Sequence, residues 1–260
     1  MKDENGDRSS APFSSFSHFP SIPPPIKLKL TVLPDHPCPY LPGRTATNRG
    51  FWAESIPGDL YQHFMDAAFR RSGKVVYQPI CRGCRECVPL RVPVMRFEQT
   101  KSQRRVWRRN DDLRVEIGPP AFSDEKFQLY QKYTTRWHGA TKESSVDDFK
   151  MFLYDSSVKT AEFVYFDSSD RMLGVGICDI GDNSLSSVYF YFDPDHASRS
   201  LGTYGALYEL AFAKMQLLEH YYLGYWVAGC PTMRYKCGFH PFQLLGTDGT
   251  WRDADKNAGD

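Results

Sequence analysis

The sequence predicts an α+β protein in which a small N-terminal unit is followed by a larger unit with a mainly antiparallel sheet. Three apolar runs, residues 160–166, 173–179 and 185–192, are separated only by turns rich in Asp, Ser and Gly, which is typical of an antiparallel meander. A helix-type run and a further strand-type run follow them. The chain divides at Gly118-Pro119-Pro120, because these residues interrupt regular structure.

The composition is that of a globular protein. Of the 260 residues, 41% are hydrophobic and 15% are aromatic, which argues against a disordered chain. No apolar run approaches the roughly 18–20 residues needed to cross a bilayer, and no apolar signal-peptide core opens the sequence. Seven cysteines, an odd number, favour reduced thiols over disulfides. We therefore expect a cytoplasmic protein with no membrane partner.

The N-terminal part begins with a segment that we do not expect to fold. Residues 1–33 are rich in Ser and Pro and lack any periodicity, so they predict a disordered leader. The N-terminal domain is expected to span residues 34–118. Within it, the apolar residues of the segment 60–71 have helical spacing, and Ser72-Gly73 marks the end of that helix.

Two strands are expected on either side of a cysteine-rich turn in this domain. Residues 75–79 and 90–97 carry the apolar and β-branched side chains of strands. Pro93 cannot donate a backbone hydrogen bond, which argues against a central position for the second strand. The basic segment 102–110 is expected to be helical.

The C-terminal domain is expected to span residues 119–250, with a tail at 251–260. Asp124 and Glu125 follow Ser123 and favour the start of a helix through the helix dipole. The other predicted elements are a helix at 147–153, the three strands of the meander, a helix at 201–218 and an aromatic strand at 221–226.

Four cysteines have the close spacing of metal ligands. A turn with two overlapping C-x-x-C steps presents sulfurs to one tetrahedral zinc ion or to an iron–sulfur cluster, and one more cysteine lies upstream. The alternative is a turn of reduced thiols that ligate nothing, because the chain holds no second C-x-x-C pair elsewhere. The candidate ligands are Cys38, Cys81, Cys84 and Cys87.

A local excess of positive charge predicts a phosphate-binding surface. The whole chain has a net charge of +1, but the segment from Arg70 to Arg109 holds twelve Lys or Arg and two acids, a balance of 12 − 2 = +10. Guanidinium groups on adjacent helical turns bind phosphates through paired hydrogen bonds. A solvated helix face is the alternative, but such a face usually has interleaved acids. The candidates are Arg70, Arg71, Lys101, Arg104, Arg105, Arg108 and Arg109.

The second half contains a layout that suits acyl transfer. A strand ends at Asp193-Pro194, and a helix entrance with Gly202 follows it. Backbone N–H groups at a helix start hold a phosphate or a developing oxyanion, and a small residue allows close approach. The alternative role for Asp193 is to cap the helix. Further along, Tyr225 and Trp226 are candidates for stacking on a terminal adenine, unless they belong to the core.

Several ordered motifs closely resemble those of the bacterial aspartate/glutamate leucyltransferases, over about residues 36–250. In the first half these are Pro37-Cys38-Pro39-Tyr40-Leu41-Pro42-Gly43-Arg44, Phe69-Arg70-Arg71-Ser72-Gly73, the Cys81–Cys87 turn with Pro89, Val92, Pro93 and Val94, and Gln103-Arg104-Arg105 with Arg108-Arg109-Asn110. In the second half they are Tyr191-Phe192-Asp193-Pro194, Arg199-Ser200-Leu201-Gly202, Tyr222-Leu223-Gly224-Tyr225-Trp226 and Met233-Arg234-Tyr235-Lys236.

The resemblance implies an enzyme that transfers leucine from leucyl-tRNA to an N-terminal Asp or Glu and so marks proteins for degradation in the N-degron pathway. It also implies a GNAT-like acyltransferase domain, tRNA and acceptor proteins as partners, no DNA and no required cofactor. The related eukaryotic arginyltransferases have a metal-binding Cys-Gly-Tyr-Cys motif, of which Cys38-Pro39-Tyr40-Leu41 retains only the first thiol.

For the chemistry we expect direct attack of the acceptor amine on the aminoacyl ester. An α-amino group has a pKa of roughly 7.7–8.0, so a useful fraction is neutral, and positioning supplies much of the acceleration. The candidates for proton removal are Asp193, Tyr191 and Tyr235, and the amides near Gly202 are the candidates for holding the oxyanion.

Charge complementarity makes Arg199 and Lys236 the candidates for reading the acidic acceptor side chain. Two alternatives stay open: arginyl-tRNA as the donor, which requires an acid in the amino-acid pocket, and a non-catalytic RNA-binding or metal-sensing protein.

Overall fold

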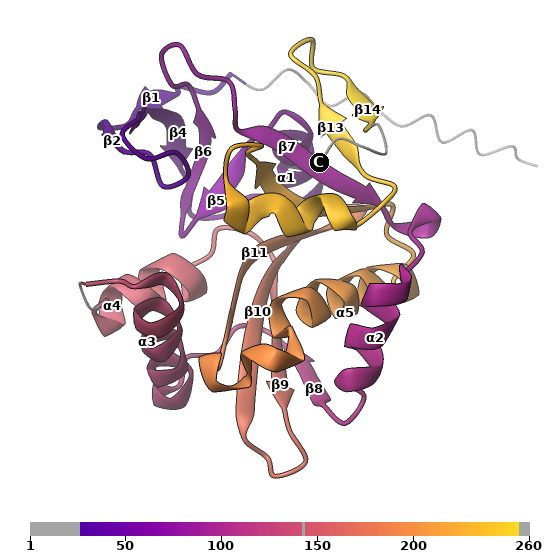
Figure 1. Ribbon diagram of the computed structural model, residues 1–260. Coiled ribbons are helices and arrows are strands. Elements are labelled where there is room, and N and C mark those ends of the chain that lie inside the picture. The colour runs from indigo at the N-terminus through magenta and orange to yellow at the C-terminus, as the bar shows by residue number, and fades with distance from the viewer. Residues whose placement is uncertain (1–26, 142–143, 255–260) are drawn as a thin grey trace, which may run out of the picture.

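The computed structural model describes residues 27–141 and 144–254, and its centre is an eight-stranded mixed sheet (Figure 1). The strand order is β14-β13-β7-β12-β11-β10-β9-β8. Every neighbouring pair is antiparallel except β11 and β12, which are parallel. The strands are β7 (Val88–Pro93), β8 (Arg114–Gly118), β9 (Thr160–Phe166), β10 (Met172–Ile180), β11 (Ser184–Phe192), β12 (His220–Trp226), β13 (Gln243–Leu245) and β14 (Trp251–Asp253).

The predicted meander is confirmed. Strands β9, β10 and β11 are antiparallel neighbours within a residue or two of the predicted bounds, and β8 extends them at the edge beside β9. Their apolar side chains point to both faces, because helices cover both faces of the sheet. Tyr189 and Tyr191 contact Tyr130 on one side, and the ring of Phe190 lies against Gly205 on the other.

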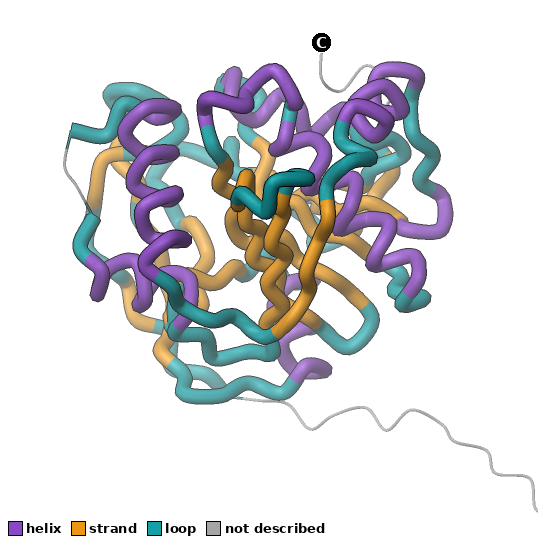
Figure 2. The backbone as a smooth tube through the Cα atoms, turned by 90° about the horizontal axis from the view of Figure 1, so that it is seen from below, coloured by secondary structure: helices purple, strands orange, loops and turns teal. Residues whose placement is uncertain are grey.

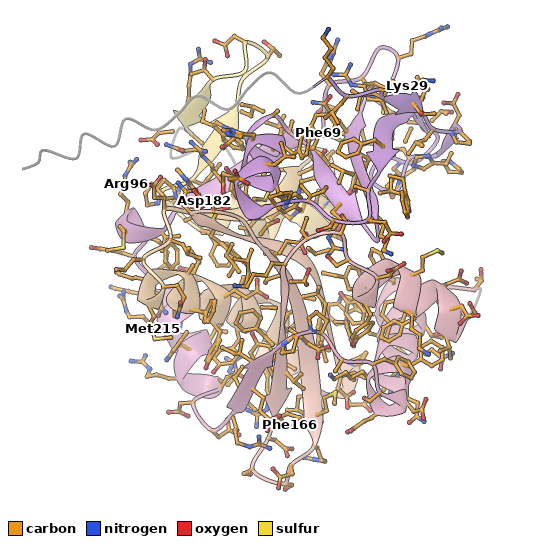
Figure 3. The ribbon with its side chains drawn as sticks, turned by 180° about the vertical axis from the view of Figure 1, so that it is seen from behind. Lys29, Phe69, Arg96, Phe166, Asp182 and Met215 are labelled. Carbon is orange, nitrogen blue, oxygen red and sulfur yellow. The ribbon has the colours of Figure 1, made fainter. Side chains whose placement is uncertain are left out.

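The sheet therefore lies between two layers of helices, as the view from below shows (Figure 2). Helices α3 (Asp124–His138) and α4 (Val146–Phe149) with the π-helical turn η2 (Lys150–Tyr154) cover one face. Helices α2 (Lys101–Arg109) and α5 (Leu201–Met215) cover the other. Ser123 caps α3 by accepting a hydrogen bond from the backbone of Lys126, as its position predicts. Aromatic rings fill both faces of the long strands, from the lobe that holds Phe69 to the far end marked by Phe166 (Figure 3).

The expected edge position of the strand around Pro93 is wrong. Strand β7 lies between β12 and β13 in the middle of this half of the sheet. Pairing with β13 involves only Leu90 and Arg91, so Pro89 and Pro93 face β13 where no ladder bond is required. The strand also ends at Pro93, and residues 94–96 form the 3-10 turn η1 (Val94–Arg96).

A smaller four-stranded antiparallel sheet forms the N-terminal lobe, in the order β1-β4-β6-β5. One face packs on helix α1 through a second hydrophobic core around Tyr61, Phe64 and Val76. The elements are β1 (Thr31–Val32), β4 (Asn48–Trp52), α1 (Gly58–Asp66), β5 (Arg70–Ser72) and β6 (Val75–Pro79), with a two-stranded pair β2 (His36–Pro37) and β3 (Thr45–Ala46) beside them.

A buried ion pair joins this lobe to the central sheet. Arg71 of β5 donates two hydrogen bonds to Asp179 of β10, at 2.6 and 2.8 Å, and both side chains are completely buried. Tyr61 and Thr160 also donate to the Asp179 carboxylate. The paired and hydrogen-bonded carboxylate is thereby fully satisfied.

Two element boundaries differ from those expected. The helix expected at 60–71 ends at Asp66, because Ala68 adopts a positive φ and the chain turns into β5. Most of the predicted leader lies outside the described residues, but its last part contains β1, which pairs with β4. Strands β7 and β8 belong to the central sheet together with the later strands, and the domain division expected at Gly118 stays a prediction.

Candidate active site

The two parallel strands of the central sheet separate and open a small polar cavity. Strands β11 and β12 pair only from Ser184 to Ser186 and from His220 to Tyr222. Beyond that point β11 carries a register irregularity against β10, and β12 carries one against β7. The cavity of about 120 Å³ lies at this separation and is lined by Tyr40, Tyr61, Arg70, Arg71, Tyr77, Ser186, Ser187, Val188, Leu223, Gly224, Tyr225 and Lys236.

Two buried cations face this cavity from different parts of the chain. Arg70 comes from β5 of the N-terminal lobe, and Lys236 comes from the 3-10 helix η4 (Pro231–Gly238). The ammonium of Lys236 donates to the carbonyl of Tyr225 at 2.6 Å, and Arg70 reaches the carbonyl of Ser187 at 3.5 Å. Burial and the neighbouring Arg70 lower the pKa of Lys236 to about 7.

Gly224 allows both cations to approach the strand. Its φ is +80°, a conformation that L side chains rarely adopt. A Cβ at this position would lie 3.2 Å from Arg70 Nη2 and 3.7 Å from Lys236 Nζ. A glycine inside an aromatic strand is a sequence signal for such a close approach.

A larger cavity of about 540 Å³ adjoins the polar one, and both are lined by Tyr40, Tyr77 and Tyr225. One wall is the outer face of the N-terminal sheet, which carries Val75, Tyr77 and Pro79 at alternate positions of β6. The opposite walls come from the loop at 38–44, the cysteine turn, the turn η2 and the end of β12. Its volume is that of a small-molecule binding site.

The four candidate metal ligands line this cavity as free thiols. The Sγ atoms of Cys38, Cys81 and Cys84 accept hydrogen bonds from Leu41 N, Thr47 N and Arg44 Nη1, at 3.4, 3.4 and 3.5 Å. Burial and the nearby cysteines raise the pKa of Cys87 to about 12, so this group stays a thiol.

In the described part of the chain, no three His, Cys, Asp or Glu side chains are grouped closely enough to hold a metal ion. The four thiols are therefore not arranged as ligands of one zinc ion or cluster in this structure.

The basic helix α2 presents its charges to solvent. A capping box formed by Thr100 and Gln103 starts the helix, and Trp107 stacks on Tyr208 of α5 at 6.1 Å. This contact holds α2 against α5, and Figure 1 shows the two helices side by side along the central sheet. The charged side chains of α2, all of them exposed, are Lys101, Arg104, Arg105, Arg108 and Arg109.

The other two tRNA candidates lie elsewhere. Arg71 is completely buried against Asp179, which leaves no surface for a phosphate, and Arg70 faces the polar cavity. The structure therefore separates these two arginines, adjacent in the sequence, from the five cations of α2.

The candidates at the start of α5 lie beside the end of α2. Arg199 binds Asp112 through two hydrogen bonds of 2.8 and 2.9 Å, and Asn110 donates to the Arg199 carbonyl. Gly202 lies in the first turn of α5, and a Cβ there would meet nothing within 4 Å. Arg199 also donates to the carbonyl of Arg109 at 3.3 Å, but the cavities described above are lined by none of Arg109, Arg199 and Gly202.

Asp193 and Tyr191 occupy structural positions. The carboxylate of Asp193 caps the 3-10 helix η3 (Pro194–Arg199) and forms an ion pair with Lys132 at 2.5 Å. Burial opposes ionisation of Asp193, but the hydrogen bonds from Lys132 and from the Asp195 backbone, together with the charges of Lys132 and His196, outweigh it and lower the pKa of the carboxyl. Tyr191 lies in the core with its hydroxyl 3.4 Å from that of Tyr154, and burial raises its pKa strongly. Neither residue lines the polar or the larger cavity.

The aromatic candidates near the end of β12 differ in role. Tyr225 lines both cavities, and its hydroxyl donates to the carbonyl of Ala68 at 2.7 Å. Trp226 packs between the main core and the small cluster around Met233. Tyr235 is about half exposed and contacts the ring of Phe239 edge-on. Of the site residues that the sequence predicts, the structure therefore brings Lys236, Tyr225 and Arg70 together at the polar cavity.

Comparison with known proteins gives two family matches. Residues 36–105 match the family described as "Arginine-tRNA-protein transferase, N terminus", and residues 125–246 match "Arginine-tRNA-protein transferase, C terminus". The chain is 38% identical to the aspartate/glutamate leucyltransferase of Hahella chejuensis over 83% of this chain and 93% of that one. It is 40% identical to the protein of the same name from Pseudomonas fluorescens, over 84% and 94%.

The solved structures that match this chain share little sequence with it. L-PGS from Bacillus licheniformis is 14% identical, with a TM-score of 0.41 over 68% of this chain and 52% of that one. FemX is 9% identical, with a TM-score of 0.42 over 82% and 65%. Among the described helices, none has the length and apolarity to span a membrane.

Proposed function

The chain belongs to the arginine-tRNA-protein transferase family, and on that premise we propose that it transfers leucine from leucyl-tRNA to the N-terminal amine of proteins that begin with Asp or Glu. The relatives named aspartate/glutamate leucyltransferase support leucine as the donor amino acid and acidic residues as the acceptors. The modified proteins would be marked for degradation. We place the reaction in the cytoplasm, where charged tRNA is available.

The observation that carries the proposal is the pair of buried cations at the separation of β11 and β12. Among the residues that the structure describes, Arg70 and Lys236 donate to the backbone carbonyls of Ser187 and Tyr225 and form no ion pair with a carboxylate. Buried charges are ordinarily paired, so two adjacent cations without an acid form a site for an incoming anion. The side-chain carboxylate of an N-terminal Asp or Glu supplies that charge.

The tRNA is proposed to bind along helix α2. Its four exposed arginines and Lys101 form a basic surface without an intervening acid. Such a surface attracts the phosphate backbone and positions it without reading sequence. The 3′ end of the tRNA would then enter the larger cavity, whose volume of about 540 Å³ accommodates an aminoacyl adenosine.

The reaction requires no covalent enzyme intermediate. The neutral acceptor amine attacks the ester carbon, an amide bond forms, the ester C–O bond breaks, and the tRNA 3′-hydroxyl leaves with a proton that the amine gives up. The chain contributes by positioning, because Arg70 and Lys236 hold the acceptor where the two cavities meet at Tyr225. We propose that the parallel strands β11 and β12 with α5 between them form a GNAT-like core around this junction.

One assay separates the proposed function from its alternatives. The protein is incubated with labelled leucyl-tRNA or arginyl-tRNA and with peptides that begin with Asp, Glu or Ala. Leucine is expected on the α-amino group of the Asp and Glu peptides. Transfer of arginine instead supports an arginyltransferase, and tRNA binding without transfer supports an RNA-binding protein. A leucyl-cysteine adduct trapped after mixing with leucyl-tRNA alone contradicts direct attack.

A further inference from the structure

We propose that the outer face of the N-terminal sheet holds the donor's leucyl side chain, and that Lys74 excludes arginine from this pocket by holding Asp155 and placing its own positive charge at the pocket's end. This inference rests on the proposed function and names the feature that selects the donor amino acid.

The face of the sheet that lines the larger cavity is apolar, although it does not belong to a core. In β6, Val76 points into the core with α1, whereas Val75, Tyr77 and Pro79 line the cavity. Trp52 of the neighbouring strand β4 lines it as well and is 60% exposed. Large exposed apolar surfaces in a concavity are typical of a ligand site, and here the ligand is a branched aliphatic side chain.

Lys74 closes the end of this face, and its ammonium already forms ion pairs with two carboxylates. Lys74 precedes Val75, and its Nζ lies 2.6 Å from Glu54 Oε2, 3.2 Å from Asp155 Oδ1 and 5.7 Å from the centre of the Trp52 ring. These carboxylates raise the pKa of Lys74, although burial opposes this, so the side chain remains an ammonium. Both Lys74 and Asp155 line the cavity.

The length and the charge of the donor side chain together decide whether it fits this end of the cavity. The junction with the polar cavity lies at Tyr77, and Val75 is two residues further along the strand, about 7 Å away. A leucyl side chain that starts at the junction ends against Val75. The longer arginyl side chain would bring its guanidinium to Lys74, where two like charges repel and both neighbouring acids, Glu54 and Asp155, are already paired with Lys74.

The remaining acids of the cavity lie in other positions. The carboxylate of Asp148 accepts hydrogen bonds from the backbone and hydroxyl of Ser145 in the capping box of α4. Glu86 lies in the cysteine turn, at the wall that the cavity shares with a neighbouring one of about 590 Å³. Glu86 therefore provides a matched control: it carries an acid into the same cavity, away from Lys74.

The test compares kcat/KM for leucyl-tRNA and arginyl-tRNA with one Asp-initiated peptide. Lys74→Met keeps the aliphatic stem over Trp52 but releases Asp155, and it should shift the ratio toward arginine by about tenfold or more. Lys74→Met combined with Glu54→Gln and Asp155→Asn, which removes both acids that Lys74 held, should bring the ratio back to that of the wild type. Lys74→Arg and the control Glu86→Gln should leave the ratio unchanged.

A second variant tests the pocket without removing the Lys74 ion pairs. Val75→Asp places a carboxylate on the apolar wall, so it should lower kcat/KM for leucyl-tRNA and raise the relative use of arginyl-tRNA. An unchanged donor ratio in both Lys74→Met and Val75→Asp overturns the inference. A wild-type protein that transfers leucine to no acceptor overturns the proposed function itself, so the two failures are distinguishable.

Discussion

Lys236 and Arg70 are buried cations that suit a binding site but lower the stability of the folded protein. Both side chains are more than nine-tenths buried, and each donates to a strand carbonyl instead of a carboxylate. Desolvation of an ammonium without a counter-ion is costly, which is why the pKa of Lys236 falls to about 7. An acidic acceptor would relieve this cost on binding, so the free protein should be measurably less stable because of Lys236.

We predict that Lys236→Met reduces the dependence of stability on pH. Between pH 7 and about 10, Lys236 is neutral in the folded protein, but the same group in the unfolded chain binds a proton. Unfolding then takes up a proton, so the free energy of unfolding of the wild type should rise with pH by up to about 1.4 kcal/mol per pH unit from this residue. Lys236→Met lacks this contribution. Urea unfolding at pH 7.5, 8.5 and 9.5 measures it, and parallel curves for the two proteins would contradict the prediction.

In helix α2, the sequence determines the helix and its charge, and packing against α5 determines which way the charged side chains point. Its basic residues indicate a helix and a phosphate-binding face, and the structure confirms the helix from Lys101 to Arg109. The stacking of Trp107 on Tyr208 holds the helix so that its arginines project into solvent. The binding of tRNA to this face remains a prediction.

Replacing Arg104, Arg105 and Arg108 together by Gln should weaken tRNA binding and make it less sensitive to salt. Each neutralised phosphate contact releases counter-ions, so the slope of log K against log salt concentration should decrease in size by about 0.7–0.9 per arginine. Fluorescence anisotropy with labelled tRNA at several salt concentrations measures the slope. Arg96→Gln is the control, because Arg96 is exposed but forms an ion pair with Asp253. An unchanged slope in the triple variant would place the tRNA elsewhere.

The elements with strong periodic patterns could be predicted from the sequence. Strands β9, β10, β11 and β12 and helices α3 and α5 follow the predicted order, because alternating apolar residues and intervening turns are local signals. The parallel pairing of β11 with β12 could not be predicted, since a strand's pattern does not say which strand lies beside it. The polar cavity arises from that pairing, so its position could not be predicted from the sequence either.

At the scale of the whole molecule, the site depends on how the N-terminal lobe is fixed to the central sheet. Arg70 and Arg71 are adjacent in β5, and they face different surroundings because strand residues alternate in direction. Arg71 joins the lobe to β10 through Asp179, and Arg70 is thereby placed opposite Lys236. The sequence indicated that both arginines belong to a basic segment, but it could not separate a structural cation from a binding one.

Breaking this connection should destabilise the protein strongly. Asp179→Asn removes the charge that compensates the buried Arg71, and loss of one partner of a buried pair costs about 3–5 kcal/mol. The matched control is Asp253→Asn, which breaks the exposed pair with Arg96 and should cost less than about 1 kcal/mol. Urea unfolding of the three proteins at one pH gives both values. A cost for Asp179→Asn no larger than that of the control would show that the pair does not hold the lobe in place.

Arg70 and Lys236 are proposed to bind the acidic side chain of the acceptor. The most direct measurement is the ratio of kcat/KM for a peptide that begins with Asp to that for the same peptide beginning with Asn, in the wild type and in Arg70→Gln, Lys236→Gln and Arg199→Gln. The ratio should be high in the wild type and in Arg199→Gln, because Arg199 is bound to Asp112, and it should fall toward one in the other two variants. A ratio that survives in both Arg70→Gln and Lys236→Gln, or that collapses only in Arg199→Gln, would contradict the account.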